Sequence, residues 1–93
     1  MKPLDPLLTT PLRLGAVSLL IKLKSASFVY LKEQLNATQG NLSVQLNKLK
    51  DADYIRIEKR FESNYPLTEV KITPTGVRAF EAHVANLKDY LHL

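Results

Sequence analysis

Residues 38–49 read Thr-Gln-Gly-Asn-Leu-Ser-Val-Gln-Leu-Asn-Lys-Leu, and the rest of the chain is interpreted around this stretch. Thr38 is suited to cap a helix, and the leucines that follow at steps of four and three share one apolar stripe. The opposite face carries amides, a hydroxyl and a cation but no carboxylate: Gly40, Asn41, Ser43, Val44, Asn47 and Lys48. Such side chains can hydrogen-bond beside a polyanion without repelling it, as the reading of base edges requires. Taken alone, a plain polar surface helix explains the stretch equally well.

The composition indicates one small domain with a single core. The 93 residues are 45% apolar and contain no cysteine, which excludes a disulfide framework and a thiolate metal site. No apolar run reaches the length of a membrane span and no secretory signal stands out, so we expect a cytoplasmic protein. The net charge of +4 suits a nucleic-acid partner but is small for a protein that coats RNA in bulk.

Two helices are expected before the opening stretch. Apolar residues at helical spacing predict the first over residues 11–24, where Gly15 should allow close packing against another helix. Ser27 can cap a second helix over residues 28–36, and a tight turn over residues 36–38 then leads into the opening stretch. Two helices joined by a tight turn, the second with an amide-rich outer face, form a helix-turn-helix.

The periodicity changes from helical to alternating at Tyr54. Residues 55–60 and 68–72 each alternate apolar with polar side chains and predict the two strands of a hairpin. Residues 62–66 read as its loop, where Pro66 is expected to end the pairing. A bare hairpin is marginal in water, so its apolar face should lie on the helices while its tip projects.

The last helix begins at Pro74 and carries a heptad seam. Its apolar residues follow at steps of three, four, three and four: Val77, Phe80, Val84, Leu87 and Leu91. The seam covers about two heptads, which is too short for an independent coiled coil. It can pack back on its own domain or form half of a subunit interface. We expect self-association through the distal residues Val84, Leu87 and Leu91.

Several short motifs occur together in an order that resembles a known family. They are Leu4–Leu8 with Pro11–Leu14, Phe28–Lys32, Gly40–Ser43 with Leu46–Leu49, Tyr54-Ile55, and Ile72–Gly76. Together they resemble the small winged-helix transcriptional regulators related to the MarR and ArsR groups, in the compact form that ends in one dimerisation helix. The implied fold is mainly α with a small β-hairpin, a winged helix-turn-helix with an extra C-terminal helix. Residues 1–93 would form one domain, with the helix-turn-helix core and wing in 1–73 and the dimerisation helix in 74–93.

The resemblance implies a homodimer that binds double-stranded DNA and regulates transcription. One recognition helix per subunit, residues 39–51, would enter each of two successive major grooves, so the DNA site would be roughly palindromic. The chain departs from the family pattern at Asp53, where relatives usually place a glycine in a left-handed conformation. The wing tip also carries few cations, which weakens the expectation of a strong minor-groove contact.

Candidate DNA contacts fall into two groups. The residues expected to contact bases are Gln39, Asn41, Ser43, Val44 and Asn47, because amides can pair with adenine and Val44 can touch a thymine methyl. The residues expected to contact the DNA backbone are Lys48, Lys32, Lys59, Arg60 and Asn64, with Ser63 and Tyr65 beside them at the wing tip. Arg13 is a weaker phosphate candidate, and Gln45, at the edge of the apolar stripe, is expected to be structural.

The sequence favours a binding protein over an enzyme. No nucleophile triad, paired carboxylates or glycine-rich phosphate loop stands out, and neither a cofactor nor a metal is expected. His83 and His92 lie on opposite faces of the last helix and are expected to be solvated or at an interface. A winged-helix module that contacts other proteins without reading DNA is the alternative. Whether a small-molecule effector exists is left open by the sequence.

Overall fold

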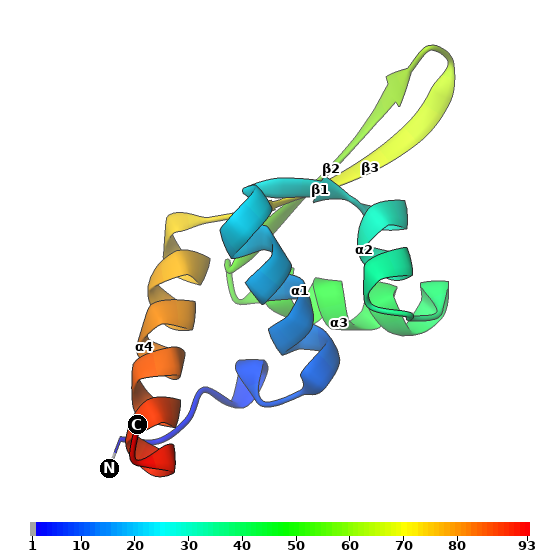
Figure 1. The fold of residues 1–93 in the computed structure, drawn as a ribbon. Coiled ribbons are helices and arrows are strands. Elements are labelled where there is room, and N and C mark those ends of the chain that lie inside the picture. The colour runs from blue at the N-terminus through cyan, green and yellow to red at the C-terminus, as the bar shows by residue number, and fades with distance from the viewer. Residues whose placement is uncertain (1) are drawn as a thin grey trace.

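Three helices lie under one face of a small antiparallel sheet in the computed structural model, which describes residues 2–93 (Figure 1). In chain order the elements are the 3-10 helix η1 (Pro6–Leu8), α1 (Pro11–Leu23), β1 (Ser25–Ser27), α2 (Phe28–Gln34), α3 (Gln39–Asp51), β2 (Ile55–Glu62), β3 (Tyr65–Ile72) and α4 (Pro74–Leu91). This arrangement confirms the expected winged helix-turn-helix with an additional C-terminal helix. Among residues 2–93, no helix combines the length and the apolar character needed to cross a bilayer.

Side-chain caps fix the starts of the two helices of the helix-turn-helix, as expected from the sequence. The Ser27 hydroxyl accepts a hydrogen bond from the Tyr30 N–H at 3.0 Å, and the Thr38 hydroxyl accepts one from the Asn41 N–H at 3.2 Å. Helix α2 ends two residues earlier than predicted. Asn36 adopts a φ of 50°, in the left-handed region that terminates a helix.

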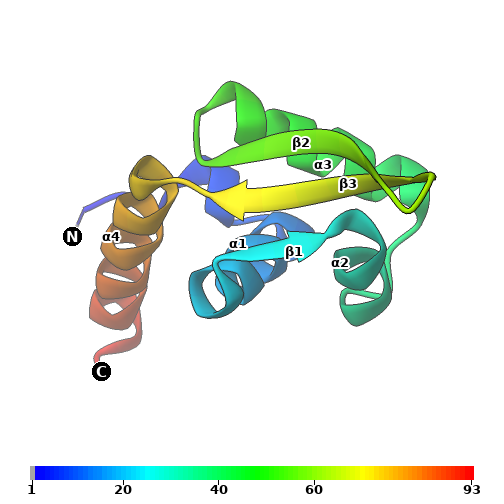
Figure 2. The same cartoon turned by 90° about the horizontal axis from the view of Figure 1, so that it is seen from above.

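A third strand, β1, completes the sheet and was not expected from the sequence. It pairs antiparallel with β3, with Ser25 opposite Lys71 and Ser27 opposite Glu69, so the strand order is β1-β3-β2 (Figure 2). The Ser-Ala-Ser segment is too short to show an alternating pattern. Its pairing fixes the base of the β2–β3 hairpin, so only the distal part of the hairpin projects as the wing (Figure 1).

The wing is longer than predicted, because its loop is a two-residue turn instead of residues 62–66. Ser63 and Asn64 have φ values of 51° and 67°, as a two-residue hairpin turn requires. Pro66 does not end the pairing but lies opposite Phe61. In such a hairpin the pair next to the turn makes the ladder hydrogen bonds and the following pair makes none, so proline at this position loses no hydrogen bond.

The core lies between the helices and the base of the sheet. The leucine stripe of α3 is fully buried, as predicted, within a cluster formed by Leu8, Ala16, Val17, Leu20, Leu31, Leu42, Leu46, Leu49, Ile55 and Val70. The close packing expected at Gly15 is confirmed, since a Cβ there would lie 2.8 Å from the Leu35 Cδ2 atom. Burial of the stripe leaves the amide-rich face of α3 pointing outward.

The turn from α3 into β2 is held by the start of α4. Asp53 has a φ of 63°, so it takes the left-handed conformation in which the resemblance led us to expect a glycine. Its carbonyl accepts a hydrogen bond from the Thr73 hydroxyl at 2.5 Å, and the same hydroxyl accepts the Gly76 N–H at 3.0 Å. Thr73 therefore caps α4 and ties it to the end of α3.

The segment before η1 passes over α4 and buries His83, which is a correction to the expectation of a solvated or interface histidine. His83 is 3% exposed, and its Nδ1 accepts a hydrogen bond from the Asp5 backbone N–H at 3.2 Å. The Asn86 side-chain amide donates to the Pro3 carbonyl at 3.3 Å. The Asp5 carboxylate in turn accepts the Tyr54 hydroxyl at 2.5 Å, so this segment links α4 to the start of β2.

The contact between Asp5 and Tyr54 predicts a loss of stability at high pH. Burial, with smaller contributions from the hydrogen bond and the charge of Asp5, raises the pKa of Tyr54 to about 12. An unfolded tyrosine ionises near pH 10. Between about pH 10 and 12 the unfolded state therefore releases a proton that the folded state retains, so the free energy of unfolding falls as the pH rises through this window.

Comparison with Tyr54→Phe isolates this effect from the titration of other groups. We expect urea unfolding at pH 8 and pH 11 to show a larger loss of stability for the wild type than for the variant, which has no hydroxyl to ionise. Equal losses in the two proteins would contradict the assignment.

Candidate nucleic-acid interface

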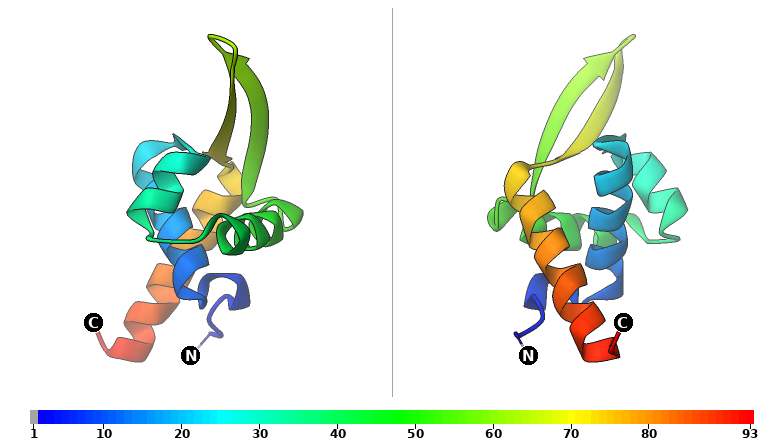
Figure 3. Two further views of the ribbon diagram at one scale, coloured as in Figure 1. Left: turned by 90° about the vertical axis from the view of Figure 1, so that its right-hand side faces the viewer. Right: turned by 60° about the vertical axis from the view of Figure 1, so that its left-hand side comes forward.

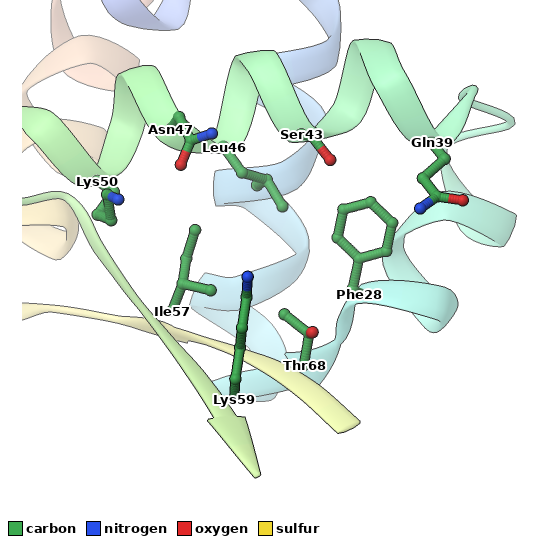
Figure 4. Close-up of a pocket in the computed structure, with 9 residues that line it drawn as sticks. All are labelled: Phe28, Gln39, Ser43, Leu46, Asn47, Lys50, Ile57, Lys59 and Thr68. Atoms are coloured by element: carbon green, nitrogen blue, oxygen red, sulfur yellow. The ribbon is translucent and has the colours of Figure 1, made fainter. Parts of the chain in front are cut away.

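The outward face of α3 carries two rows of side chains, all of them polar except Val44. Gln39, Ser43, Asn47 and Lys50 recur at steps of four, four and three, and they face the wing (Figure 4). A second row, Asn41, Val44 and Lys48, is exposed on α3 but does not line the space beside the wing. Val44 is 52% exposed, which is unusual for a valine. Its side chain is therefore free to make an apolar contact.

A groove of about 520 Å³ separates α3 from the wing. Its lining residues are Phe28, Gln39, Ser43, Leu46, Asn47, Lys50, Ile57, Lys59 and Thr68. In Figure 4 the Lys59 ammonium points from β2 toward α3, opposite the polar row on that helix. None of these nine residues is acidic, so the groove can approach a polyanion without charge repulsion.

Lys50 is a groove residue that the sequence interpretation did not include. Its place in the row that begins at Gln39 was the signal that could have identified it. Together with Lys59, it places a cation on each wall of the groove. A phosphate approaching between α3 and the wing would meet both.

The two faces of the wing differ in whether their cations are already paired with carboxylates. Successive residues along β2 lie on opposite sides of the sheet. Lys59 faces the groove, whereas Arg60 points to the other side and forms an ion pair with Glu69 at 3.0 Å. On that side Lys71 also pairs with Glu58, at 3.2 Å. The wing thus presents one unpaired lysine to the groove and a neutralised far face.

Two other residues predicted to contact the DNA backbone lie outside the groove. Asn64 is in the turn at the wing tip, and Lys32 is on α2; neither lines the groove. The wing tip is aromatic instead of basic, since Phe61 is 77% and Tyr65 is 76% exposed. The small number of cations expected at the tip is therefore matched by the structure.

Arg13 is not available to a phosphate, which corrects its assignment as a weak candidate. It is 9% exposed, and its Nε donates to the Leu7 carbonyl at 2.7 Å. Its guanidinium also donates to the Gln45 Oε1 atom. The Gln45 Nε2 in turn donates to the Asn41 Oδ1 at 3.1 Å, which confirms the structural role expected for Gln45.

Comparisons with known proteins agree with this geometry. Residues 12–91 match the family described as the winged helix DNA-binding domain. The chain belongs to this family. It is 36% identical over 72 residues to the uncharacterized protein MJ0432 of Methanocaldococcus jannaschii, a match that covers 77% of this chain and 78% of that protein.

Two solved structures share the fold. The transcriptional regulator homologue protein from Pyrococcus horikoshii OT3 superposes with a TM-score of 0.87 at 27% sequence identity, over 92% of this chain and 85% of that chain. The ytfH protein of Salmonella typhimurium superposes with a TM-score of 0.76 at 18% identity, over 92% and 75% of the two chains, which shows the fold alone. The winged-helix family and the first of these similarities support a DNA-binding regulatory protein, and they are compatible with the MarR and ArsR relation.

Proposed function

We propose that this protein is a sequence-specific regulator of transcription that binds double-stranded DNA as a homodimer in the cytoplasm. The observation that carries the proposal is the carboxylate-free groove between the amide-bearing face of α3 and Lys59 of the wing. Residues 39–51 would enter the major groove, which is wide enough to admit a helix. Membership of a DNA-binding family supports the same function.

The residues of α3 divide by chemistry into base contacts and backbone contacts. Gln39, Asn41, Ser43 and Asn47 carry donors and acceptors that match base edges, and Val44 matches a thymine methyl. Lys48 and Lys50 lie in the last turn of the helix, and they would contact phosphates. Their contribution would be to fix the position of α3 on the duplex, with sequence read by the amides and the hydroxyl.

On the wing and on α2, Lys59 is the strongest candidate for a backbone contact because it faces the groove. Lys32 and Asn64 would contact phosphates outside the groove. Arg60 would contribute only if phosphate replaced Glu69 as its partner, since the two side chains are paired in the free protein.

The homodimer is proposed to form through α4. The helix extends past the three-helix body (Figure 3), and its distal apolar side chains are incompletely covered. Val84 and Leu87 are half-buried, whereas Leu91 is 55% exposed. Pairing two such helices about a two-fold axis would bury these side chains and place one α3 in each half-site. On this proposal residues 1–73 bind DNA and residues 74–93 dimerise.

Charge placed on the distal seam should separate the subunits. In Leu87→Glu/Leu91→Glu, two carboxylates per subunit would be buried together in the dimer, so we expect a monomer of 10.5 kDa in place of a dimer of twice that mass. Sedimentation equilibrium measures this directly. Val29→Glu, at an exposed apolar position on α2, is the control and should leave the dimer intact. A wild-type monomer, or a double variant that still dimerises, would contradict the proposal.

DNA binding itself is tested by salt dependence. A dimer with about eight phosphate contacts should lose on the order of 10⁴-fold in duplex affinity between 50 and 200 mM salt. At a fixed salt it should also prefer some sequences over bulk competitor DNA. Duplex binding without any sequence preference would contradict sequence-specific regulation, and absence of duplex binding would contradict the function as a whole.

Contact with another protein is the second candidate, and the exposed aromatic wing tip is the observation that favours it. Phe61 and Tyr65 offer apolar surface of the kind enriched in protein interfaces. Sequence preference in duplex binding distinguishes the two functions. Under DNA reading through α3, the wild type shows a preference that persists in Phe61→Ser/Tyr65→Ser. Under the alternative, the wild type shows no preference.

A further inference from the structure

Three side chains form a directed chain of hydrogen bonds from the core to the outer face of α3. Arg13 of α1 is buried and its guanidinium donates to the Oε1 of Gln45. The Nε2 of Gln45 donates to the Oδ1 of Asn41 at 3.1 Å. Asn41 is exposed and is one of the residues assigned above to base contacts.

The direction of this chain is set by chemistry. A guanidinium has five N–H donors and no acceptor, so only the carbonyl oxygen of the Gln45 amide can face Arg13. The Gln45 amide then turns its NH2 group toward Asn41, and only the Asn41 carbonyl oxygen can receive it. Arg13 cannot swing away, because its Nε is also held by the Leu7 carbonyl at 2.7 Å.

These hydrogen bonds determine which atoms of Asn41 are presented at the surface. With Oδ1 turned toward Gln45, Asn41 presents its Nδ2 hydrogens to the solvent. An unrestrained asparagine could rotate its amide and offer either a donor or an acceptor to a base. The chain from Arg13 removes this freedom and makes Asn41 a donor.

We infer that Gln45 is a specificity-determining positioning residue, which fixes the Asn41 amide so that it selects base edges bearing acceptors. The inference rests on the proposed function, since it requires α3 to lie in the major groove. Guanine offers two acceptors there, N7 and O6, whereas cytosine offers the N4 amino donor. At the position read by Asn41, guanine is therefore favoured and cytosine is disfavoured.

Gln45→Glu should reverse the direction of the hydrogen bond between residue 45 and Asn41 while keeping the contact with Arg13. One carboxylate oxygen keeps the contact with Arg13, and the other can only accept a hydrogen bond. Asn41 must then turn its Nδ2 toward residue 45 and present Oδ1 to the DNA. Gln45→Met keeps the length of the side chain but removes both polar atoms, so the Asn41 amide becomes free to rotate.

The experiment selects bound sequences from a random duplex pool at one salt concentration, using the wild type, both Gln45 variants and Asn41→Ala. At one position of each half-site we expect the ratio of guanine to cytosine to fall about tenfold or more in Gln45→Glu, because one hydrogen bond to a base is gained or lost. Gln45→Met and Asn41→Ala should lose the preference at that position and keep it elsewhere. Comparing base ratios within each selection removes the general loss of affinity caused by the added carboxylate.

The possible results distinguish failure of the role inferred for Gln45 from failure of the proposed DNA-binding function. If the wild type enriches a site and Gln45→Glu enriches the same base at every position, the inference is wrong while the proposed function stands. An unchanged preference in Asn41→Ala overturns the inference in the same way. If the wild type enriches no sequence, the proposed function fails and the inference fails with it. Gln45→Met provides the test if the glutamate variant does not fold.

Discussion

Gly76→Ala is expected to destabilise the protein by about 3 kcal/mol, although alanine is intrinsically the better helix residue. A Cβ at this position would lie 2.2 Å from the Tyr54 carbonyl oxygen. That oxygen belongs to the backbone and already accepts the Thr73 N–H at 3.1 Å, so it cannot move without opening the corner between β2 and α4. The start of α4 would have to shift away from the sheet.

Urea unfolding measures this effect, and the chain offers a matched control. Gly40 is also helical, but a Cβ there would meet no atom within 4 Å. Gly40→Ala should therefore stabilise the protein by about 0.5 kcal/mol. Opposite signs for the two substitutions are the expected result. A Gly76→Ala variant as stable as the wild type would show that the close approach at this corner does not constrain the fold.

Asn47→Ala/Lys48→Ala is expected to weaken duplex binding on the order of 100-fold while leaving the dimer intact. Each subunit would lose one base-contacting amide, so the homodimer would lose about 2–6 kcal/mol, and 100-fold lies near the lower end of this range. Each subunit would also lose one phosphate contact, which weakens binding to all sequences. Both residues are exposed and outside the core, so the fold should persist. The salt dependence of binding should also become shallower, because Lys48 no longer displaces counterions.

Fluorescence anisotropy with a labelled duplex, at several salt concentrations, measures both effects. Lys22→Ala/Gln34→Ala is the matched control, because it removes one exposed amide and one exposed cation outside α3 and the groove. The control should bind within a few-fold of the wild type. If the two double variants bind equally well, α3 is not the surface that reads DNA.

Helices α3 and α4 could be predicted because their signals are local. The leucine stripe and the Thr38 cap both lie within the helix that they define, and the observed α3 has the predicted bounds. Strand β1 could not be predicted. Its three residues carry no period, and its partner strand comes more than 40 residues later, with Ser25 opposite Lys71. The burial of His83 likewise depends on a distant segment, which includes Asp5.

The residue types of the candidate site could be read from the sequence, but the partners of its charged side chains could not. The absence of carboxylates on the outer face of residues 38–49 could be read directly, and the one exposed carboxylate of α3 is Asp51 at its end. Alternation from Ile55 and Ile57 places Lys59 on the helix-facing side of β2 and Arg60 on the other side. The ion pair of Arg60 with Glu69 depends on the register of β2 against β3 and could not be predicted. Arg13 was misassigned because its partners, among them Gln45 on α3, are brought to it only by folding.

Selection of bound sequences from a random duplex pool by the wild-type protein tests the central claim most directly. A homodimer that reads DNA through α3 should enrich a two-fold symmetric site. Its half-sites should be about one helical turn apart, roughly 10 base pairs from centre to centre. Enrichment of such a site is the result that the proposed function requires. A pool that stays unenriched at moderate salt would contradict it.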